Sequence, residues 1–217
     1  MDRDRFADRS EAGRELGREL AKRFGGRDDL IVLALPRGGV PVGHAVAQAL
    51  HAPLDVFIVR KLGVPWHPEL AMGAIATGGV RVLNDEVLGF AGVSQRDIEL
   101  VAATEQRELV RREKAYRGDR SPLNVANKIA ILADDGLATG STMRAAVRAL
   151  RNMNPQKVVV AVPVASIEAC RLLERDADEM ICLRTPEPFE AVGLWYRDFT
   201  QTTDEEVHEL LGEGVAS

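Results

Sequence analysis

The hydrophobic residues of this chain gather in short, nearly continuous runs. Five runs rich in Val, Ile or Leu lie at residues 30–35, 54–59, 129–133, 158–164 and 180–183. Runs of this length without polar alternation are typical of strands covered on both faces, as in a parallel sheet with helices above and below it. The pattern therefore predicts five buried strands.

Helical patterns lie between these runs. Apolar residues between 42 and 49 are spaced three and four apart, and those between 143 and 150 repeat this spacing. Ser166 and Thr203 are candidate N-caps for two later helices, the last of which ends near Gly212. Because strands and helices alternate, we expect an α/β fold with an open, mainly parallel sheet and helices on both faces. Ligands of such folds bind beyond the carboxyl ends of the strands.

Two segments depart from this alternation. Residues about 9–24 carry apolar positions four apart, which predicts an N-terminal helix before any strand. Residues about 84–118 form a long polar stretch with a narrow apolar stripe and Ser94 as a candidate cap, and we interpret this stretch as a helical insertion. A solvated surface helix and a dimer contact both fit the insertion.

Composition and charge narrow the class of protein. The chain has 217 residues, 46% of them apolar, and a formal net charge of −5, so we expect one globular domain over residues 1–217. The mild acidity and the lack of a long Lys/Arg run argue against a nucleic-acid partner. No apolar stretch approaches the roughly 18 residues that cross a bilayer, and the N-terminus is too charged for a signal peptide. We therefore expect a cytoplasmic protein without a membrane partner.

The two cysteines, Cys170 and Cys182, have no Cys-x-x-Cys spacing. Neither a disulfide framework nor a zinc site is indicated, and we expect two buried, reduced thiols that serve packing.

The most informative segment is KIAILADDGLATGSTM at residues 128–143. A predicted strand ends in Asp134 and Asp135, and a loop of small residues, 136–142, then leads directly into a predicted helix. Small residues let backbone N–H groups converge, and a helix N-terminus favours negative charge, so this loop is suited to a phosphate. The adjacent carboxylates are suited to vicinal sugar hydroxyls, because charge-assisted hydrogen bonds are short and directional. The segment therefore predicts a sugar-phosphate site.

Other phosphate motifs fit less well. The loop lacks the Lys and the spacing of a P-loop, and residues 38–43 lack the Gly-x-Gly-x-x-Gly spacing of a dinucleotide fold. An ordinary strand-to-helix turn remains an alternative interpretation.

The stretch ILADDGLATGSTM resembles the phosphoribosyl-pyrophosphate (PRPP) motif of type I phosphoribosyltransferases, and the resemblance extends over about residues 30–199. It implies a core parallel sheet with a small C-terminal hood, here about 184–212. It also implies an enzyme of nucleotide and nucleoside metabolism, with PRPP and a small nitrogen base as partners. The enzyme would transfer the 5-phosphoribosyl group of PRPP to a nitrogen of an unidentified, purine-like base and release pyrophosphate. Substitution at C1 would pass through an oxocarbenium-like state, as in glycoside cleavage.

The resemblance also assigns roles to the motif. Asp134 and Asp135 would hold the ribose 2- and 3-hydroxyls and favour the developing positive charge. Ala138 to Thr142 would bind the 5-phosphate. The PRPP-binding residues of this loop would be Gly136, Ala138, Thr139, Gly140, Ser141 and Thr142.

Two further segments are similar to parts of the family's pyrophosphate site. Arg37, Gly38 and Gly39, after the first run, match the pyrophosphate loop, in which a strained or cis peptide at Pro36-Arg37 is expected. Arg60-Lys61 resembles the basic pair of adenine-type members, with Arg60 on PRPP and Lys61 in catalysis. A plain glycine turn and a solvated charge pair are the respective alternatives. Residues 62–73 would then form the mobile lid that excludes water.

The segment 188–199 is similar to the hood of hypoxanthine-type members. By that resemblance Phe189 stacks on the base, Val192 lines the base pocket and Asp198, one residue later than in that pattern, faces a magnesium ion on the pyrophosphate. Core packing of Phe189 and its aromatic neighbours is an alternative. Mg²⁺ is the expected cofactor, since it binds through few carboxylates and mostly through phosphate oxygens and water.

The acceptor stays open at this stage. Ala138 stands where hypoxanthine-type members have Asp, as in adenine-type members, which disfavours a 6-oxopurine. A non-catalytic regulator that binds PRPP or a nucleotide on the same fold is the main alternative function, because fold does not fix function. A hydrolase on the same site is a third. Many members of the family dimerise, so a homodimer is a further expectation.

Overall fold

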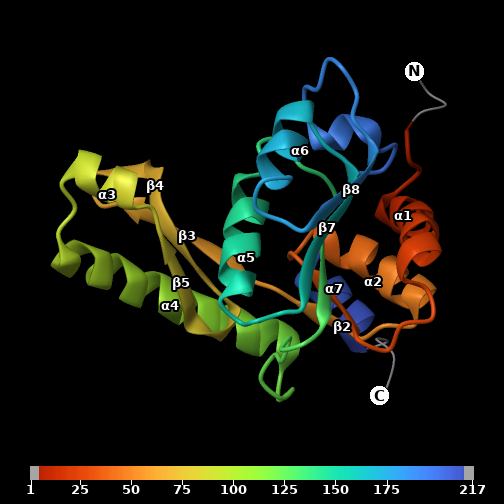
Figure 1. Ribbon diagram of the computed structural model, residues 1–217, viewed down its shortest axis with the longest axis horizontal. Coiled ribbons are helices and arrows are strands. Elements are labelled where there is room, and N and C mark those ends of the chain that lie inside the picture. The colour runs from red at the N-terminus through yellow and green to blue at the C-terminus, as the bar shows by residue number, and fades with distance from the viewer. Residues whose placement is uncertain (1–4, 213–217) are drawn as a thin grey trace.

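Five parallel strands form the central sheet of the computed structural model, which describes residues 5–212 (Figure 1). The strand order is β2-β1-β6-β7-β8, and every neighbouring pair is parallel. The strands are β1 (Leu30–Ala34), β2 (Leu54–Val56), β6 (Ile129–Ala133), β7 (Lys157–Val164) and β8 (Glu179–Arg184). All five predicted strands are therefore present, in an open parallel sheet.

Helices cover both faces of this sheet, as predicted. On one face pack α1 (Arg9–Phe24) and α2 (Gly39–Leu50), against alternate strand residues such as Val32 and Ile131. On the other face pack α5 (Ser141–Arg151) and α6 (Ile167–Leu173), against the strand residues between them, such as Leu33 and Leu132. β1, β2, β6 and nearly all of β7 are thus buried, which explains their continuous apolar runs. The edge strand β8 was expected to be buried as well, but only its Ile181 is.

Two predicted helix caps are confirmed. The Ser166 hydroxyl accepts a hydrogen bond from the Ala169 amide at the start of α6. The Thr203 hydroxyl accepts one from the Glu206 amide at the start of α7 (Asp204–Gly212), which ends at the expected residue. Side-chain caps of this kind satisfy amides that have no partner inside the helix.

The predicted second strand is too long. β2 ends at Val56, and the Phe57 amide still donates to the Ala34 carbonyl before the chain leaves the sheet. Val59 then begins a different strand. Phe57 and Ile58 are buried, at 0% and 2% exposure, so their hydrophobicity continues the run although they lie outside the sheet.

A second sheet was not predicted. β3 (Val59–Val64), β4 (His67–Ala76) and β5 (Val80–Leu83) form a three-stranded antiparallel sheet in that order, with the short helix η2 (Thr77–Gly79) before β5. The segment 62–73, expected to be a lid, forms most of the β3–β4 hairpin. Whether the hairpin moves stays a prediction.

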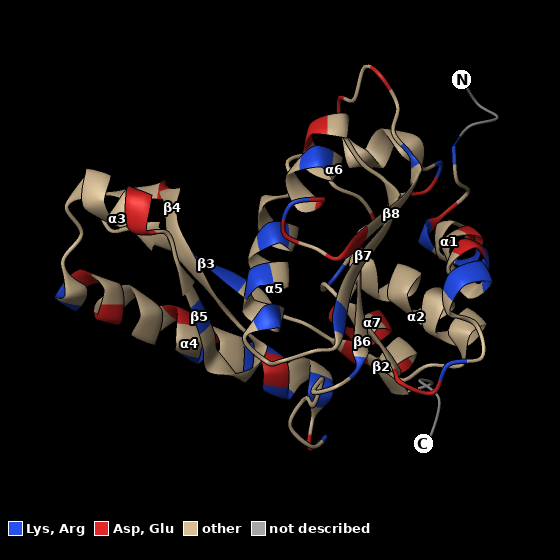
Figure 2. Cartoon of the chain, in the orientation of Figure 1, with Lys and Arg blue, Asp and Glu red and all other residues tan. Residues whose placement is uncertain are grey.

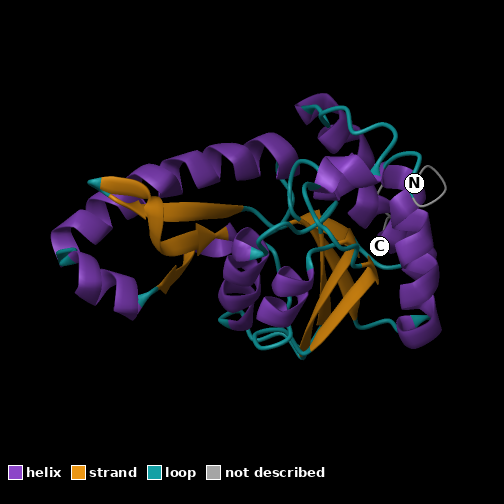
Figure 3. Cartoon of the chain, turned by 90° about the horizontal axis from the view of Figure 1, so that it is seen from above, coloured by secondary structure: helices purple, strands orange, loops and turns teal. Residues whose placement is uncertain are grey.

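Two helices follow this sheet, in the region where a polar helical stretch was predicted. They are α3 (Asp85–Ala91) and α4 (Gln95–Arg117), and Ser94 forms a capping box with Asp97. Only Ile98, Ala102, Leu109 and Tyr116 of α4 are buried. We call residues 59–117 the arm, because in Figures 1 and 3 they extend to one side of the central sheet.

Ionic and polar contacts join the base of the arm to the central sheet. Arg117 forms a two-pronged ion pair with Asp55 of β2, with Nε–Oδ1 and Nη2–Oδ2 distances of 2.9 and 3.0 Å. The Tyr116 hydroxyl donates to Asp204 of α7 at 2.8 Å. The Arg117 and Asp55 side chains are only 10% and 12% exposed, so this pair is largely removed from water.

Elsewhere charges of both signs are interspersed along the surface helices (Figure 2). Within residues 5–212, no helix combines the length and the hydrophobicity that crossing a bilayer requires. Cys170 and Cys182 are free thiols, as expected; Cys170 is buried, whereas Cys182 is only partly buried.

The Arg117–Asp55 pair yields a stability prediction. Asp55→Asn leaves the Arg117 charge buried without its partner, and we expect unfolding in urea to become easier by about 3 kcal/mol. The matched control is Glu108→Gln, which removes a partly exposed carboxylate paired with Arg111 and Arg112 on the same helix. The control should unfold like the wild type. Equal destabilisation by both substitutions would contradict the anchoring role of the buried pair.

Candidate active site

Two loops meet at the carboxyl edge of the central sheet. β1 and β6 pair in register, with Ala34 opposite Ala133, so the segments after these strands lie side by side. A Cβ atom added to Gly38 would lie 2.1 Å from Oδ2 of Asp135, and one added to Gly39 would lie 2.7 Å from the Ala133 carbonyl oxygen. Only glycine fits this contact. The structure thus brings the predicted pyrophosphate loop against the acid pair, and the expected cis peptide bond is present at Pro36-Arg37.

The predicted phosphate loop, residues 136–142, leads into α5 and is fixed by its backbone conformation and by hydrogen bonds. Gly140, directly before the helix, has a φ of 71°, a conformation that favours glycine. The Leu137 amide donates to the Val164 carbonyl, and the Ser166 hydroxyl donates to the Ala138 carbonyl, so β7 and its following turn anchor the loop. Thr139, Ser141 and Thr142 are exposed at the helix N-terminus, where hydroxyls and amides can bind an anion.

The acid pair carries a large electrostatic cost. Burial raises the pKa of Asp134 well above its ordinary range, and the neighbouring charge of Asp135 raises it further. Burial also raises the pKa of Asp135, while the hydrogen bond and charge of Arg9 oppose that rise. The Asp135 amide donates to Oδ1 of Asp134 at 2.8 Å, and Nε of Arg9 donates to Oδ2 of Asp135 at 2.8 Å. One oxygen of each carboxylate is therefore already bound within the protein.

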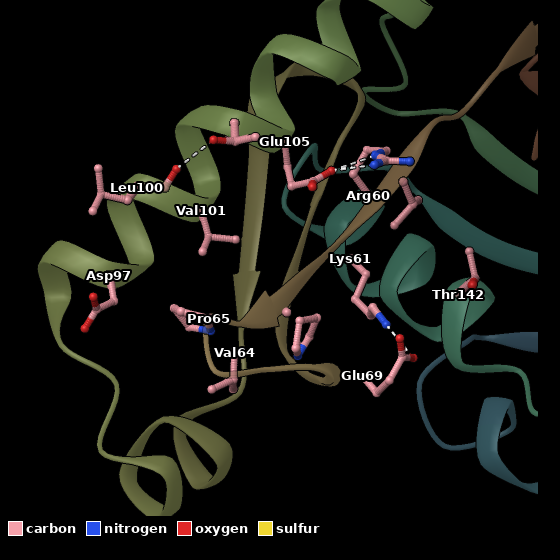
Figure 4. A pocket seen from close by; sticks show the side chains of 14 residues that line it. Arg60, Lys61, Val64, Pro65, Glu69, Asp97, Leu100, Val101, Glu105 and Thr142 are labelled. Atoms are coloured by element: carbon pink, nitrogen blue, oxygen red, sulfur yellow. Dashed lines mark hydrogen bonds and ion pairs between the residues drawn. The ribbon is translucent and has the colours of Figure 1, made fainter.

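The predicted basic pair lies on the arm, in ion pairs (Figure 4). Arg60 contacts Glu105 of α4 at 2.7 Å, and Lys61 contacts Glu69 of β4 at 3.3 Å. Both side chains line a cavity of about 790 Å³ between the β3–β4 hairpin and α4, and Thr142 of the phosphate loop lines it too. The structure thus brings the basic pair and the phosphate loop to one cavity, although acidic side chains hold both cations. Arg37 is half-exposed, with Nη1 3.6 Å from Asp204.

The hood candidates lie close to the phosphate loop. Cγ1 of Val192 is so near Gly136 that a Cβ atom there would lie 2.6 Å from it. Phe189 and Val192 are partly buried and pack on the cluster of Phe6 and Tyr196. Phe189 therefore has the packing contacts of the alternative interpretation, and its stacking on a base stays a prediction.

A metal ion would find few protein ligands here. Among residues 5–212, no group of three or more His, Cys, Asp or Glu side chains could hold one. Asp198 is exposed, and its Oδ1 accepts hydrogen bonds from the amide and hydroxyl of Thr200 at 2.9 and 2.6 Å, which lower its pKa. It lines a cleft of about 290 Å³ that Arg9 and Pro41 also line. This donor set fits an ion held mainly by phosphate oxygens and water, as is usual for Mg²⁺.

Comparison with known proteins decides the family. A family model described as a phosphoribosyl transferase domain matches residues 3–194. The chain belongs to this family. Two curated proteins of Mycobacterium tuberculosis, from strains CDC 1551 / Oshkosh and ATCC 25618 / H37Rv, are each named "Putative phosphoribosyl transferase". Both are 47% identical to this chain over 206 residues, which are 95% of this chain and 46% of each relative. The chain thus spans about half the length of the curated relatives it matches.

Solved structures show the same fold. The crystal structure of TT1426 from Thermus thermophilus is similar with a TM-score of 0.88 and 42% identity, covering 98% of this chain and 100% of that one. The AQ2163 protein from Aquifex aeolicus, 14% identical, has a TM-score of 0.50 over 96% of this chain and 87% of that one, and shares the fold alone. The predicted family and open parallel α/β fold are confirmed, and the family is one of transferases.

Several contacts of this phosphoribosyl transferase domain join residues that no local sequence pattern connects. Arg9 lies 126 residues from Asp135 in sequence, and no spacing signal connects them. The same holds for Glu105, which holds Arg60. Tyr196 lies in the predicted hood segment, and its hydroxyl donates to the Asp135 carbonyl at 2.5 Å. Each contact depends on tertiary structure, which the local pattern does not encode.

The raised pKa of Asp134 predicts that this residue destabilises the domain at neutral pH. A carboxyl whose pKa rises on folding binds its proton more tightly when folded, so its ionisation lowers stability as the pH increases above its unfolded value of about 3.9. Asp134→Asn removes this cost and keeps an oxygen for the Asp135 amide. We expect the variant to be more stable by about 1 kcal/mol at pH 7, with the gain shrinking towards pH 4.

Urea unfolding at both pH values measures this difference. Asp198→Asn is the control of opposite sign, because Thr200 lowers the pKa of Asp198 and its ionisation favours folding. A loss of stability in Asp134→Asn at pH 7 would contradict the assigned cost.

Proposed function

We propose that this chain is a magnesium-dependent phosphoribosyltransferase that moves the 5-phosphoribosyl group of PRPP to a nitrogen of a purine-like base and releases pyrophosphate. The observation that carries the proposal is the contact of Gly38 with the Asp135 carboxylate, beside a phosphate loop that opens α5. This contact supports an order of sites for pyrophosphate, ribose hydroxyls and 5-phosphate that matches the order in which PRPP presents these groups. Family membership over residues 3–194 supports PRPP-based transfer in general.

The ribose is assigned to the acid pair. Oδ1 of Asp134 and Oδ2 of Asp135 are bound by an amide and by Arg9, so we assign the second oxygen of each carboxylate to one ribose hydroxyl. Two carboxylates beneath the ring also favour the positive charge that develops as the C1–oxygen bond breaks. Burial of the pair strengthens this electrostatic effect.

The two ends of PRPP are assigned to the two loops. The 5-phosphate binds the amides of the loop 136–142 and the hydroxyls of Thr139, Ser141 and Thr142. Pyrophosphate binds Arg37 and the backbone at Gly38 and Gly39, and leaves with the electron pair of the C1–oxygen bond as the base nitrogen forms its bond to C1. Bound Mg²⁺, with Asp198 as its candidate protein ligand, would neutralise charge on the leaving group.

Arg60 and Lys61 bind PRPP only if each exchanges its acidic partner for a phosphate oxygen. Lys61 is half-exposed and its contact with Glu69 at 3.3 Å is weak, so exchange for a phosphate oxygen costs little. The Arg60–Glu105 pair is more enclosed. Because acidic side chains hold both cations, a second candidate function is a regulator that binds PRPP or a nucleotide without turnover. For the acceptor, we propose a base beneath Phe189 and Val192, and Ala138 disfavours a 6-oxopurine.

Titration with PRPP and Mg²⁺, followed by assays of pyrophosphate release with a panel of bases, tests the function. We expect binding, and release with one purine-like base. The double variant Asp134→Asn, Asp135→Asn should lose PRPP binding while it stays folded by circular dichroism, because its amides no longer offer charged acceptors to the ribose. Unchanged affinity in the folded variant would exclude the ribose assignment. Binding without release for any base would favour the regulator.

The substitution Arg37→Ala tests the role of the pyrophosphate loop separately from the rest of the site. A lost charge-assisted contact should weaken PRPP by about tenfold or more and leave nucleoside monophosphates, which carry no pyrophosphate, nearly unaffected. Calorimetry of both ligands measures the ratio, with the exposed Arg14→Ala on α1 as control. Equal losses for both ligands would argue against the loop assignment.

A further inference from the structure

Arg9 stands at a junction of three parts of the molecule. Its Nε donates to Oδ2 of Asp135 at 2.8 Å, and its Nη1 donates to the Thr200 carbonyl of the hood at 2.7 Å. Its guanidinium carbon lies 3.9 Å from the centre of the Phe199 ring. A Cβ atom at Gly38, in the pyrophosphate loop, would lie 3.4 Å from the same Nε atom. One side chain therefore contacts the acid pair and the hood and lies beside the predicted pyrophosphate loop.

The segment before Arg9 is joined to the hood by backbone hydrogen bonds. The Phe6 amide donates to the Trp195 carbonyl at 2.9 Å, and the Arg197 and Asp198 amides donate back to Phe6 and Ala7 at 2.8 and 2.9 Å. The ring centres of Phe6 and Tyr196 are 5.5 Å apart. Residues 5–9, which we call the N-terminal strap, thus pair with residues 195–198, and Arg9 leads from this pairing to Asp135.

The Arg9–Asp135 contact is enclosed. The two side chains are only 11% and 15% exposed. An ion pair with little access to water requires good geometry, and loss of one partner leaves an uncompensated charge. Arg9 is held in its position by three contacts at once, which also limits the rotation of the Asp135 carboxylate.

Several other titratable or charged side chains lie around the Arg9–Asp135 contact. Asp134 lies beside Asp135, and the Tyr196 hydroxyl, whose pKa is raised by burial and by the charge of Asp135, donates to the Asp135 carbonyl. Arg184 of β8 lies over the Phe6 ring, and the charge of Arg9 helps to lower the pKa of Asp198. Among these groups, Arg9 is the cation hydrogen-bonded to the Asp135 carboxylate.

We propose that Arg9 is a positioning residue for ribose recognition, which fixes the Asp135 carboxylate against the pyrophosphate loop and ties it to the hood. This inference rests on the proposed function, because it assumes that Asp135 receives a ribose hydroxyl. Arg9 itself touches no substrate. It opposes the rise that burial causes in the pKa of Asp135 and leaves the second carboxylate oxygen in a fixed direction. The N-terminal strap, outside the PRPP motif, thereby contributes to affinity for PRPP.

Carboxyl titration by ¹³C NMR tests the positioning directly, with Asp135→Asn to assign the signal. In Arg9→Met, which keeps the apolar stem over Phe199, the apparent pKa of Asp135 should rise by about one pH unit or more, since an opposite charge at this distance is lost. Arg9→Lys should stay close to the wild type, because the charge is kept. Arg14→Met, an exposed substitution on the same helix, should change nothing. An unchanged titration in folded Arg9→Met would overturn the proposal.

PRPP affinity at pH 7 is the second measurement. Arg9→Met should bind about tenfold more weakly or worse, and Arg9→Lys should bind several-fold more weakly despite its nearly normal titration, because Lys lacks the fork that reaches both Asp135 and Thr200. Wild-type affinity in Arg9→Lys would overturn the tie to the hood, even if Arg9→Met failed to fold. A wild-type chain that does not bind PRPP would overturn the proposed function and, with it, the ribose role of Arg9. Binding by the wild type with equal binding by Arg9→Met would overturn this inference alone.

Discussion

The parallel pairing of β1 with β6 determines where every other part of the site can lie. Parallel neighbours end at the same edge, so the turn after Ala34 and the turn after Ala133 must share one space. That space is so narrow that the backbone of Gly38 touches the Asp135 carboxylate. A Cβ atom at Gly38 would displace the Asp135 carboxylate, and one at Gly39 would collide with the backbone of Ala133 and Asp134. The chemistry of the site is thus limited first by the spacing of two strands.

The adjacent carboxylates of Asp134 and Asp135 carry an electrostatic cost, which neighbouring groups reduce in part. Two adjacent carboxylates at a buried edge repel each other and lose hydration, which is why the pKa values of both are raised. An amide bound to Asp134 and the guanidinium of Arg9 bound to Asp135 reduce this cost without removing it. Sites that bind ligands through buried charge commonly lose some stability in this way.

A feature is predictable from the sequence when the residues that form it lie close together along the chain. Continuous apolar runs reveal all five strands of the central sheet, although the edge strand β8 is only partly buried. The same signal places the end of β2 too late, because Phe57 and Ile58 are buried although they lie outside the sheet. The loops 36–39 and 136–142 are contiguous, so their residues could be recognised together. The hairpin of β3 and β4 mixes exposed polar residues with Gly63 and Gly73 and has an irregular register, so it gave no strand pattern. Arg9–Asp135 and Arg60–Glu105 join distant segments, and only the fold reveals them.

The arm has a consequence for the way this domain can change over evolution. Residues 59–117 leave the central sheet after β2 and return before β6, so they are inserted between two strands that flank β1. The entropy of closing such a loop grows only slowly with its length, so lengthening or shortening the arm alters the cost of forming the β1–β6 pair very little. The arm also carries Arg60 and Lys61 on one wall of a cavity that Thr142, from the loop 136–142, lines too. Ligand preference could therefore diversify through the arm while the edge that holds the two loops together stays constant.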